Sequence, residues 1–134
     1  LAAGFAVFIT FQALDFIIHS IILAPVYASL SNVWRQDMMS LMWMMPVTSI
    51  LFSYLMAWIF VKGYEDRGIM EGVRFGILMC FFANGIGGLS QYSMYPLPFS
   101  LVVKWFLYGL PEFILAGIVL SVIYKNKEEI DVEE

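Results

Sequence analysis

Residues 1–30 read LAAGFAVFITFQALDFIIHSIILAPVYASL. This stretch is apolar almost throughout, and it exceeds the roughly 20 residues that a helix needs to cross the hydrocarbon core of a membrane. Asp15 and His19 lie one helical turn apart in its middle. Ionisable side chains at such positions are costly to insert and usually face a protein interior. The stretch therefore predicts a transmembrane helix with one polar face.

The composition of the whole chain also indicates a membrane protein. The 134 residues are 61% hydrophobic and 13% charged, whereas the charged share of soluble domains is about 25%. Four apolar stretches are long enough to span a membrane, at about residues 2–30, 39–61, 69–89 and 99–124. Because the connections are short, neighbouring helices should be antiparallel. We expect an all-α fold, a four-transmembrane-helix antiparallel bundle formed by residues 1–124.

The distribution of basic residues predicts how this bundle is oriented. With four spans, both termini and the middle loop lie on one side of the membrane. That side carries most of the basic residues, namely Lys62, Arg67, Arg74, Lys125 and Lys127, and the other side carries Arg35 and Lys104. The positive-inside rule places both termini in the cytoplasm. Residues 125–134 then form an acidic cytoplasmic tail, and the net charge of −4 offers no footprint for nucleic acid.

Polar residues within the spans predict an intramembrane cluster. Gln12, Asp15 and His19 follow a spacing of three and four residues, which places them on one face of the first helix. Tyr108 and Glu112 share a face of the fourth helix. Counting from the ends of the spans places Asp15 and Glu112 near the midplane and His19 level with Tyr108.

This cluster has three interpretations that the sequence leaves open. The polar groups could hold helices together or anchor a partner helix through hydrogen bonds. They could form a proton or cation path in which His19 passes the proton toward the outer side. Asp15, His19 and Glu112 could also bind a divalent metal ion. We assign no catalytic residue and expect no cofactor, because no nucleophile stands beside a base and no metal-ligand cysteine spacing is present.

The third expected helix carries a stripe of small or short side chains at every fourth position. Its members are Gly68, Gly72, Gly76, Cys80, Asn84 and Gly88. In lipid, such a stripe allows another helix backbone to approach closely. Ser49, Ser53 and Ala57 repeat the spacing on the second helix, so we expect that helix to be the internal partner of the stripe.

The chain resembles an uncharacterised family of small bacterial four-helix integral membrane proteins over nearly its whole length. The residues that carry the resemblance are Asp15, His19, Pro25, Tyr27, Trp34-Arg35, Lys62-Gly63-Tyr64-Glu65, Gly68, Glu71-Gly72, Gly76, Pro96, Pro98 and Gly109 through Gly117 around Glu112. The resemblance implies the four-helix topology and a bacterial inner membrane location. It implies no activity and no catalytic residue.

These observations favour a small accessory or scaffold subunit of a larger membrane complex, because the polar stripes and the glycine face provide helix contacts without catalytic machinery. The expected partners are membrane lipid and either other membrane subunits or further copies of the chain. One alternative is a small proton- or cation-linked transporter that acts as a homo-oligomer. Another is a membrane metal-binding protein. An enzyme is less favoured.

Overall fold

The computed structural model describes the backbone of residues 1–132 and the side chains of residues 1–124, and this part of the chain is helical with no strand. Four helices are long and apolar enough to cross a membrane: Ala2–Ile22, Met44–Lys62, Ile69–Met94 and Phe99–Tyr124. The all-helical prediction and the prediction of four such segments are confirmed. The chain thus has the elements of a multi-pass membrane protein.

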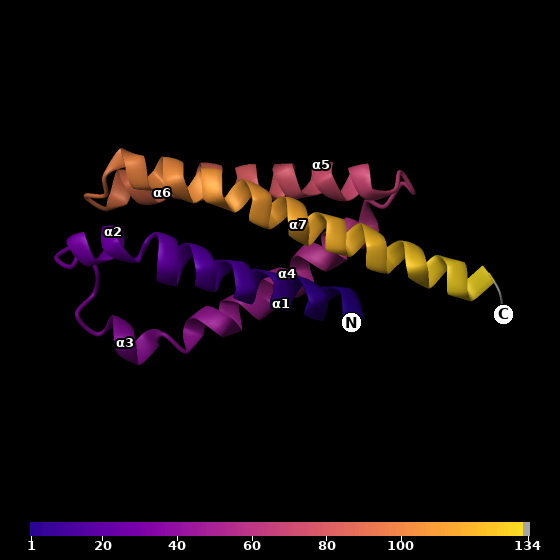
Figure 1. Cartoon of the computed structure of the whole chain (residues 1–134), viewed down its shortest axis with the longest axis horizontal. Helices are drawn as coiled ribbons and strands as arrows, with labels where there is room; N and C mark the ends of the chain where they lie inside the picture. The colour runs from indigo at the N-terminus through magenta and orange to yellow at the C-terminus, as the bar shows by residue number, and fades with distance from the viewer. Residues whose placement is uncertain (133–134) are drawn as a thin grey trace.

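The helices are more broken than the apolar stretches suggested. The described elements are α1 Ala2–Asp15, η1 Phe16–Ile22, α2 Ala24–Ser29, α3 Met38–Leu41, α4 Met44–Lys62, α5 Ile69–Cys80, η2 Phe81–Ile86, α6 Gly87–Met94 and α7 Phe99–Val132 (Figure 1). The first span ends at Ile22 rather than residue 30, and the third extends to Met94 rather than residue 89. The helix of the fourth span continues past Tyr124 to Val132. No helix therefore ends at residue 125, where we expected the tail to begin.

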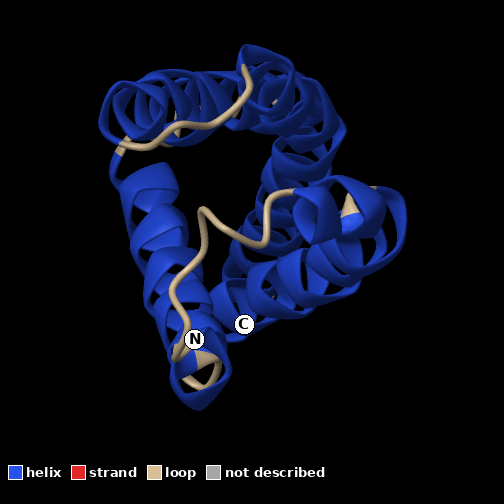
Figure 2. Ribbon diagram, turned by 90° about the vertical axis from the view of Figure 1, so that its left-hand side faces the viewer, coloured by secondary structure: helices blue, strands red, loops and turns tan. Residues whose placement is uncertain are grey.

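The helices pack in the order α5, α7, α1, α4. The closest pairs are α5 with α7, α1 with α4, and α1 with α7, and Figure 1 shows α7 running between α5 and α1. A short loop joins α4 to α5, yet these two helices are not a main packing pair. Figure 2 looks along the helices from one end and shows the loops that connect them. Neighbours in sequence are therefore not always the main neighbours in space.

Two apolar clusters hold this arrangement together. The larger joins α1, α4, α5 and α7 through buried side chains that include Val7, Met56, Cys80 and Ala116. In it, the rings of Phe11 and Phe113 meet edge-on, with centroids 5.2 Å apart. The smaller cluster packs Ile18, Leu23, Leu97 and Leu101 at the other end of α1 and α7. The predicted polar residues Asp15 and Glu112 lie along the stretch where these two clusters meet.

The glycine stripe packs on α7, and the prediction that it packs on the second helix is wrong. A Cβ on Gly72 would overlap backbone atoms of Gly117, and one on Gly76 would overlap the carbonyl oxygen of Phe113. Further along, Cys80 Sγ lies 3.7 Å from the carbonyl oxygen of Phe106.

The last members of the stripe behave differently from one another. The side chain of Asn84 donates to the carbonyl oxygen of Trp105 at 3.0 Å, and Gly88 faces Val102. Gly68 takes no part, because nothing lies within 4 Å of its Cβ position and its φ of +66° serves the start of α5. The second helix, α4, packs mainly on α1, and its Ser53 and Ala57 are buried.

Candidate intramembrane polar site

The candidate site lies where α1 gives way to η1. Asp15 is the last residue of α1, and His19 lies within the wider π-helical turns of η1. Such insertions in α-helices are often found at functional sites. Glu112 comes from α7, directly after Pro111, which lies inside that helix and cannot donate a backbone hydrogen bond. The broken first span and the proline together place polar groups between two apolar clusters.

Asp15 and Glu112 are in hydrogen-bonding contact through their carboxyl groups. Glu112 is only 5% exposed, and its Oε1 has no hydrogen-bond partner among the residues whose side chains are described. An ionised carboxylate only accepts hydrogen bonds, so a bond between two carboxyl groups requires a proton on one of them. The pair can therefore hold a proton inside the span.

His19 lies between Asp15 and Tyr27 of α2 and contacts both. Its Nε2 lies 3.5 Å from Asp15 Oδ1, and its Nδ1 hydrogen-bonds to the hydroxyl of Tyr27. The imidazole and the Tyr27 ring are stacked with centroids 5.8 Å apart. Each imidazole nitrogen therefore faces a different partner, as a group that accepts a proton on one side and releases it on the other requires.

Tyr27 is fixed in turn by two tryptophans. Trp105 Nε1 donates to the Tyr27 hydroxyl at 2.8 Å, and Trp34 Nε1 donates to the Tyr27 carbonyl oxygen at 3.1 Å. Because the hydroxyl accepts from Trp105, its own proton is available to His19 Nδ1, which favours the tautomer with the N–H on Nε2, facing Asp15. The contacts thus run from Glu112 through Asp15, His19 and Tyr27 to Trp105.

The structure brings together only part of the predicted cluster. Asp15, His19 and Glu112 belong to one line of contacts, whereas the Gln12 side chain is exposed. Tyr108 is half-buried against the smaller apolar cluster, and His19 pairs with Tyr27. The sequence reasoning missed the roles of Tyr27 and Trp105. The only signal was an aromatic residue eight positions after His19, and a regular helix would turn it about 80° away from His19.

The metal interpretation finds no support in this geometry. Within residues 1–124, no three His, Cys, Asp or Glu side chains come together in a way that could hold a metal ion. Asp15, His19 and Glu112 therefore do not form the three-ligand site that their spacing allowed.

The site is open on one side. The side chains of Asp15 and His19 are 43% and 41% exposed, and Gln12 lies on the same helix one turn before them. By contrast, Glu112 faces inward. Comparisons with protein-family models, with curated proteins and with solved structures found no match to this chain, so its function is inferred from the geometry of these residues.

Proposed function

We propose that this chain is a small accessory or scaffold subunit of a larger membrane protein assembly. The observation that carries the proposal is the partial exposure of Asp15 and His19 within an apolar segment. Charged and polar groups inside the membrane almost always face other protein or water rather than lipid. The face formed by Gln12, Asp15 and His19 is therefore a surface for another membrane helix, which a further subunit or a second copy would supply.

The proposal includes a topology and a location. The four helices would run antiparallel, with both termini in the cytoplasm of a bacterium and the spans in its inner membrane. Basic residues are more numerous on the side of the membrane that holds the middle loop and the termini, which supports this orientation. We also propose that the chain belongs with the small bacterial four-helix membrane proteins that it resembles.

The assembly is tested by extracting the native protein in mild detergent and measuring the mass of the intact particle. We expect a stable particle that contains other subunits or additional copies of the chain. A variant with Asp15→Asn and His19→Gln should reduce that association, while Asp37→Asn, in the exposed loop after α2, serves as a control of similar chemistry. A monomeric chain that accounts for the whole extracted population would contradict the proposal.

A second candidate function is proton-linked transport by a homo-oligomer. It is favoured by the line of contacts from Glu112 through Asp15 and His19 to Tyr27. Proton transfer along hydrogen-bonded side chains of this kind is typical of intramembrane relays. Four helices enclose little interior space, so neighbouring copies would complete the path.

The transport candidate is tested by proton flux into vesicles that contain the purified protein. Asp15→Asn and Glu112→Gln should each abolish flux while leaving the helix content and the particle mass unchanged. Asp37→Asn should conduct as the unmodified protein does. Equal flux in all four proteins would remove this candidate and leave the structural role.

A further inference from the structure

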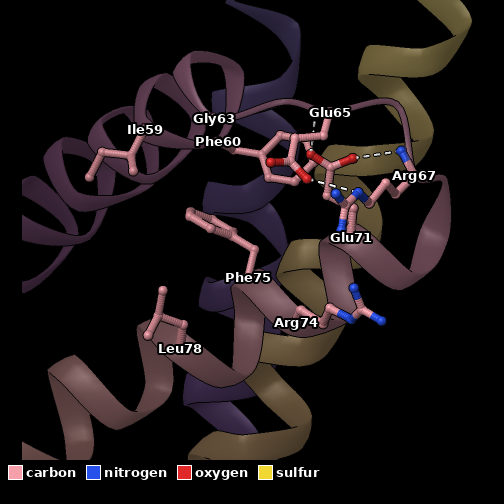
Figure 3. A pocket seen from close by; sticks show the side chains of 9 residues that line it. All are labelled: Ile59, Phe60, Gly63, Glu65, Arg67, Glu71, Arg74, Phe75 and Leu78. Carbon is pink, nitrogen blue, oxygen red and sulfur yellow. Dashed lines mark hydrogen bonds and ion pairs between the residues drawn. The ribbon is translucent and has the colours of Figure 1, made fainter.

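A cavity of about 370 Å³ lies between the end of α4 and the start of α5, away from the polar site. Its lining comes from the last turns of α4, the loop that follows and the first turns of α5 (Figure 3). The cavity exists because α4 packs on α1 and α5 packs on α7, so that the two helices diverge from their shared loop. Its size is in the range of small-molecule sites.

One half of the cavity is apolar. Ile59 and Phe60 from α4 face Phe75 and Leu78 from α5 across the opening (Figure 3). The ring of Phe60 packs edge-on against that of Phe75, with centroids 5.2 Å apart, and closes the inner wall. Leu78 is 65% exposed. This half therefore opens toward the surface that the apolar spans present to lipid.

The other half is charged, but most of its charges are already satisfied. Arg67 Nε lies 2.8 Å from Glu65 Oε2. The carboxylate of Glu71 accepts hydrogen bonds from the backbone amides of Glu65 and Arg67, at 2.7 and 2.9 Å. Figure 3 shows these contacts gathered at the loop end of the cavity.

Arg74 is the exception in this lining. No residue with a described side chain forms an ion pair or a hydrogen bond with its guanidinium. It lies five residues beyond the start of the third span, about 8 Å along the helix. A guanidinium at that depth needs an anionic partner or must extend to the headgroups.

We propose that this cavity binds one anionic phospholipid, with the phosphodiester on Arg74 and an acyl chain along Phe75 and Leu78. Charge complementarity supports this occupant, because arginine forms strong charge-assisted hydrogen bonds with phosphate. Lipid headgroups are bound by basic residues between transmembrane helices on the cytoplasmic side. Here Arg74 is the cation of the lining that is left without a partner among the described side chains.

The test is native mass spectrometry of the full-length protein in mild detergent, titrated with phosphatidylglycerol. Diacylglycerol with the same acyl chains is the comparison, because it lacks the phosphate. We expect one phosphatidylglycerol to bind per chain and diacylglycerol to bind more weakly. Arg74→Gln should weaken phosphatidylglycerol binding about tenfold, the effect of losing one charge-assisted hydrogen bond.

Lys62→Gln is the matched control. Lys62 is also a cation and is the last residue of α4, next to the cavity, but it does not line the cavity. Its Nζ lies 5.8 Å from the centroid of the Trp58 ring. It should bind phosphatidylglycerol as the unmodified protein does. Leu78→Trp should fill the apolar half of the cavity and weaken phosphatidylglycerol binding. Leu78 is exposed, so the larger side chain should not disturb the fold. Helix content by circular dichroism verifies that each variant is folded.

Three results would overturn the proposal. Equal losses for Arg74→Gln and Lys62→Gln would mean that general surface charge attracts the lipid. Equal binding of diacylglycerol and phosphatidylglycerol would mean that the phosphate is not recognised. A second copy of the chain in place of lipid in the mass spectrum, lost on Leu78→Trp, would likewise assign the cavity to a protein contact.

Discussion

Gly72 of α5 lies so close to Gly117 of α7 that a side chain on either residue would overlap the backbone of the other. This is the tightest form of helix contact, in which van der Waals packing replaces the hydrophobic effect that is absent between helices in lipid. The same interface continues to Gly76, which faces the backbone of Phe113. The pairing of α5 with α7 therefore depends on the absence of side chains at these positions.

Gly72→Ala should lower the free energy of unfolding by about 1–3 kcal/mol, the usual cost of overpacking a close contact. Gly87→Ala is the control, because nothing lies within 4 Å of its Cβ position, and we expect a change below about 1 kcal/mol. Unfolding by a denaturing detergent, followed by circular dichroism, measures both. Equal effects of the two substitutions would mean that the α5–α7 interface is not as close as described.

Substitutions at Asn84 and Gly109 should have strongly non-additive effects on the free energy of unfolding. The Asn84 amide occupies the space where a Gly109 side chain would lie, while it donates to the carbonyl oxygen of Trp105. Asn84→Ala alone should cost about 0.5–2 kcal/mol, as interhelical hydrogen bonds do. Gly109→Ala should be destabilising in the unmodified protein but tolerated in the Asn84→Ala background. Additive effects in this double-mutant cycle would argue against the contact.

Glu112 offers a way to separate a structural role from a relay. Glu112→Gln keeps the size of the side chain and provides an N–H donor for Asp15, so the stability should change by less than about 1 kcal/mol. Glu112→Ala should cost about 2–3 kcal/mol, because it leaves a cavity beside Asp15. Denaturation of the two variants compares these values. If Glu112→Gln were as damaging as Glu112→Ala, the two carboxyl groups would not share a hydrogen bond.

The loop between α4 and α5 should depend on Glu71 more than on Glu65. Glu71 accepts from two backbone amides, whereas Glu65 forms an exposed ion pair with Arg67. Glu71→Ala should cost about 1–2 kcal/mol and speed trypsin cleavage after Arg67. Glu65→Ala should cost less than about 1 kcal/mol. Faster cleavage in Glu65→Ala than in Glu71→Ala would reverse this assignment.

The hydrophobic pattern predicted the four apolar helices because crossing a membrane requires a minimum length of apolar residues. It did not predict the interruptions at η1 and η2, since π-helical turns have no composition of their own and depend on local packing. Residues such as Phe81 and Phe82 within η2 are as apolar as their helical neighbours. The ends of the spans were therefore the least accurate part of the prediction.

The spacing of small residues identified the packing face of the third helix but not its partner. Ser53 and Ala57 have the right spacing and are buried on the second helix, yet that helix packs mainly on α1 and not on α5. Gly109, Gly117 and Ser121 continue the same spacing on α7 and carry the signal that was overlooked. Spacing defines which residues share a face, whereas the choice between two suitable neighbours depends on the packing of the whole fold.

The polar site was predictable to a similar extent. Spacing placed Asp15 and Glu112 at one depth, and the structure brings them into contact. The pairing of His19 with Tyr27 arises from the wider turns of η1 and from the break before α2, neither of which a regular helix contains. Gln12 shares the face in an ideal helix but remains on the outside.

The most direct test of the proposed assembly is photo-crosslinking in intact membranes, with a photoreactive amino acid in place of Gln12. The same substitution at Leu51, which is 65% exposed on α4, provides the comparison. We predict a protein adduct from position 12 in much higher yield than from position 51, with mass spectrometry identifying the partner as another subunit or a second copy. Lipid adducts alone, in equal yield from both positions, would contradict the account.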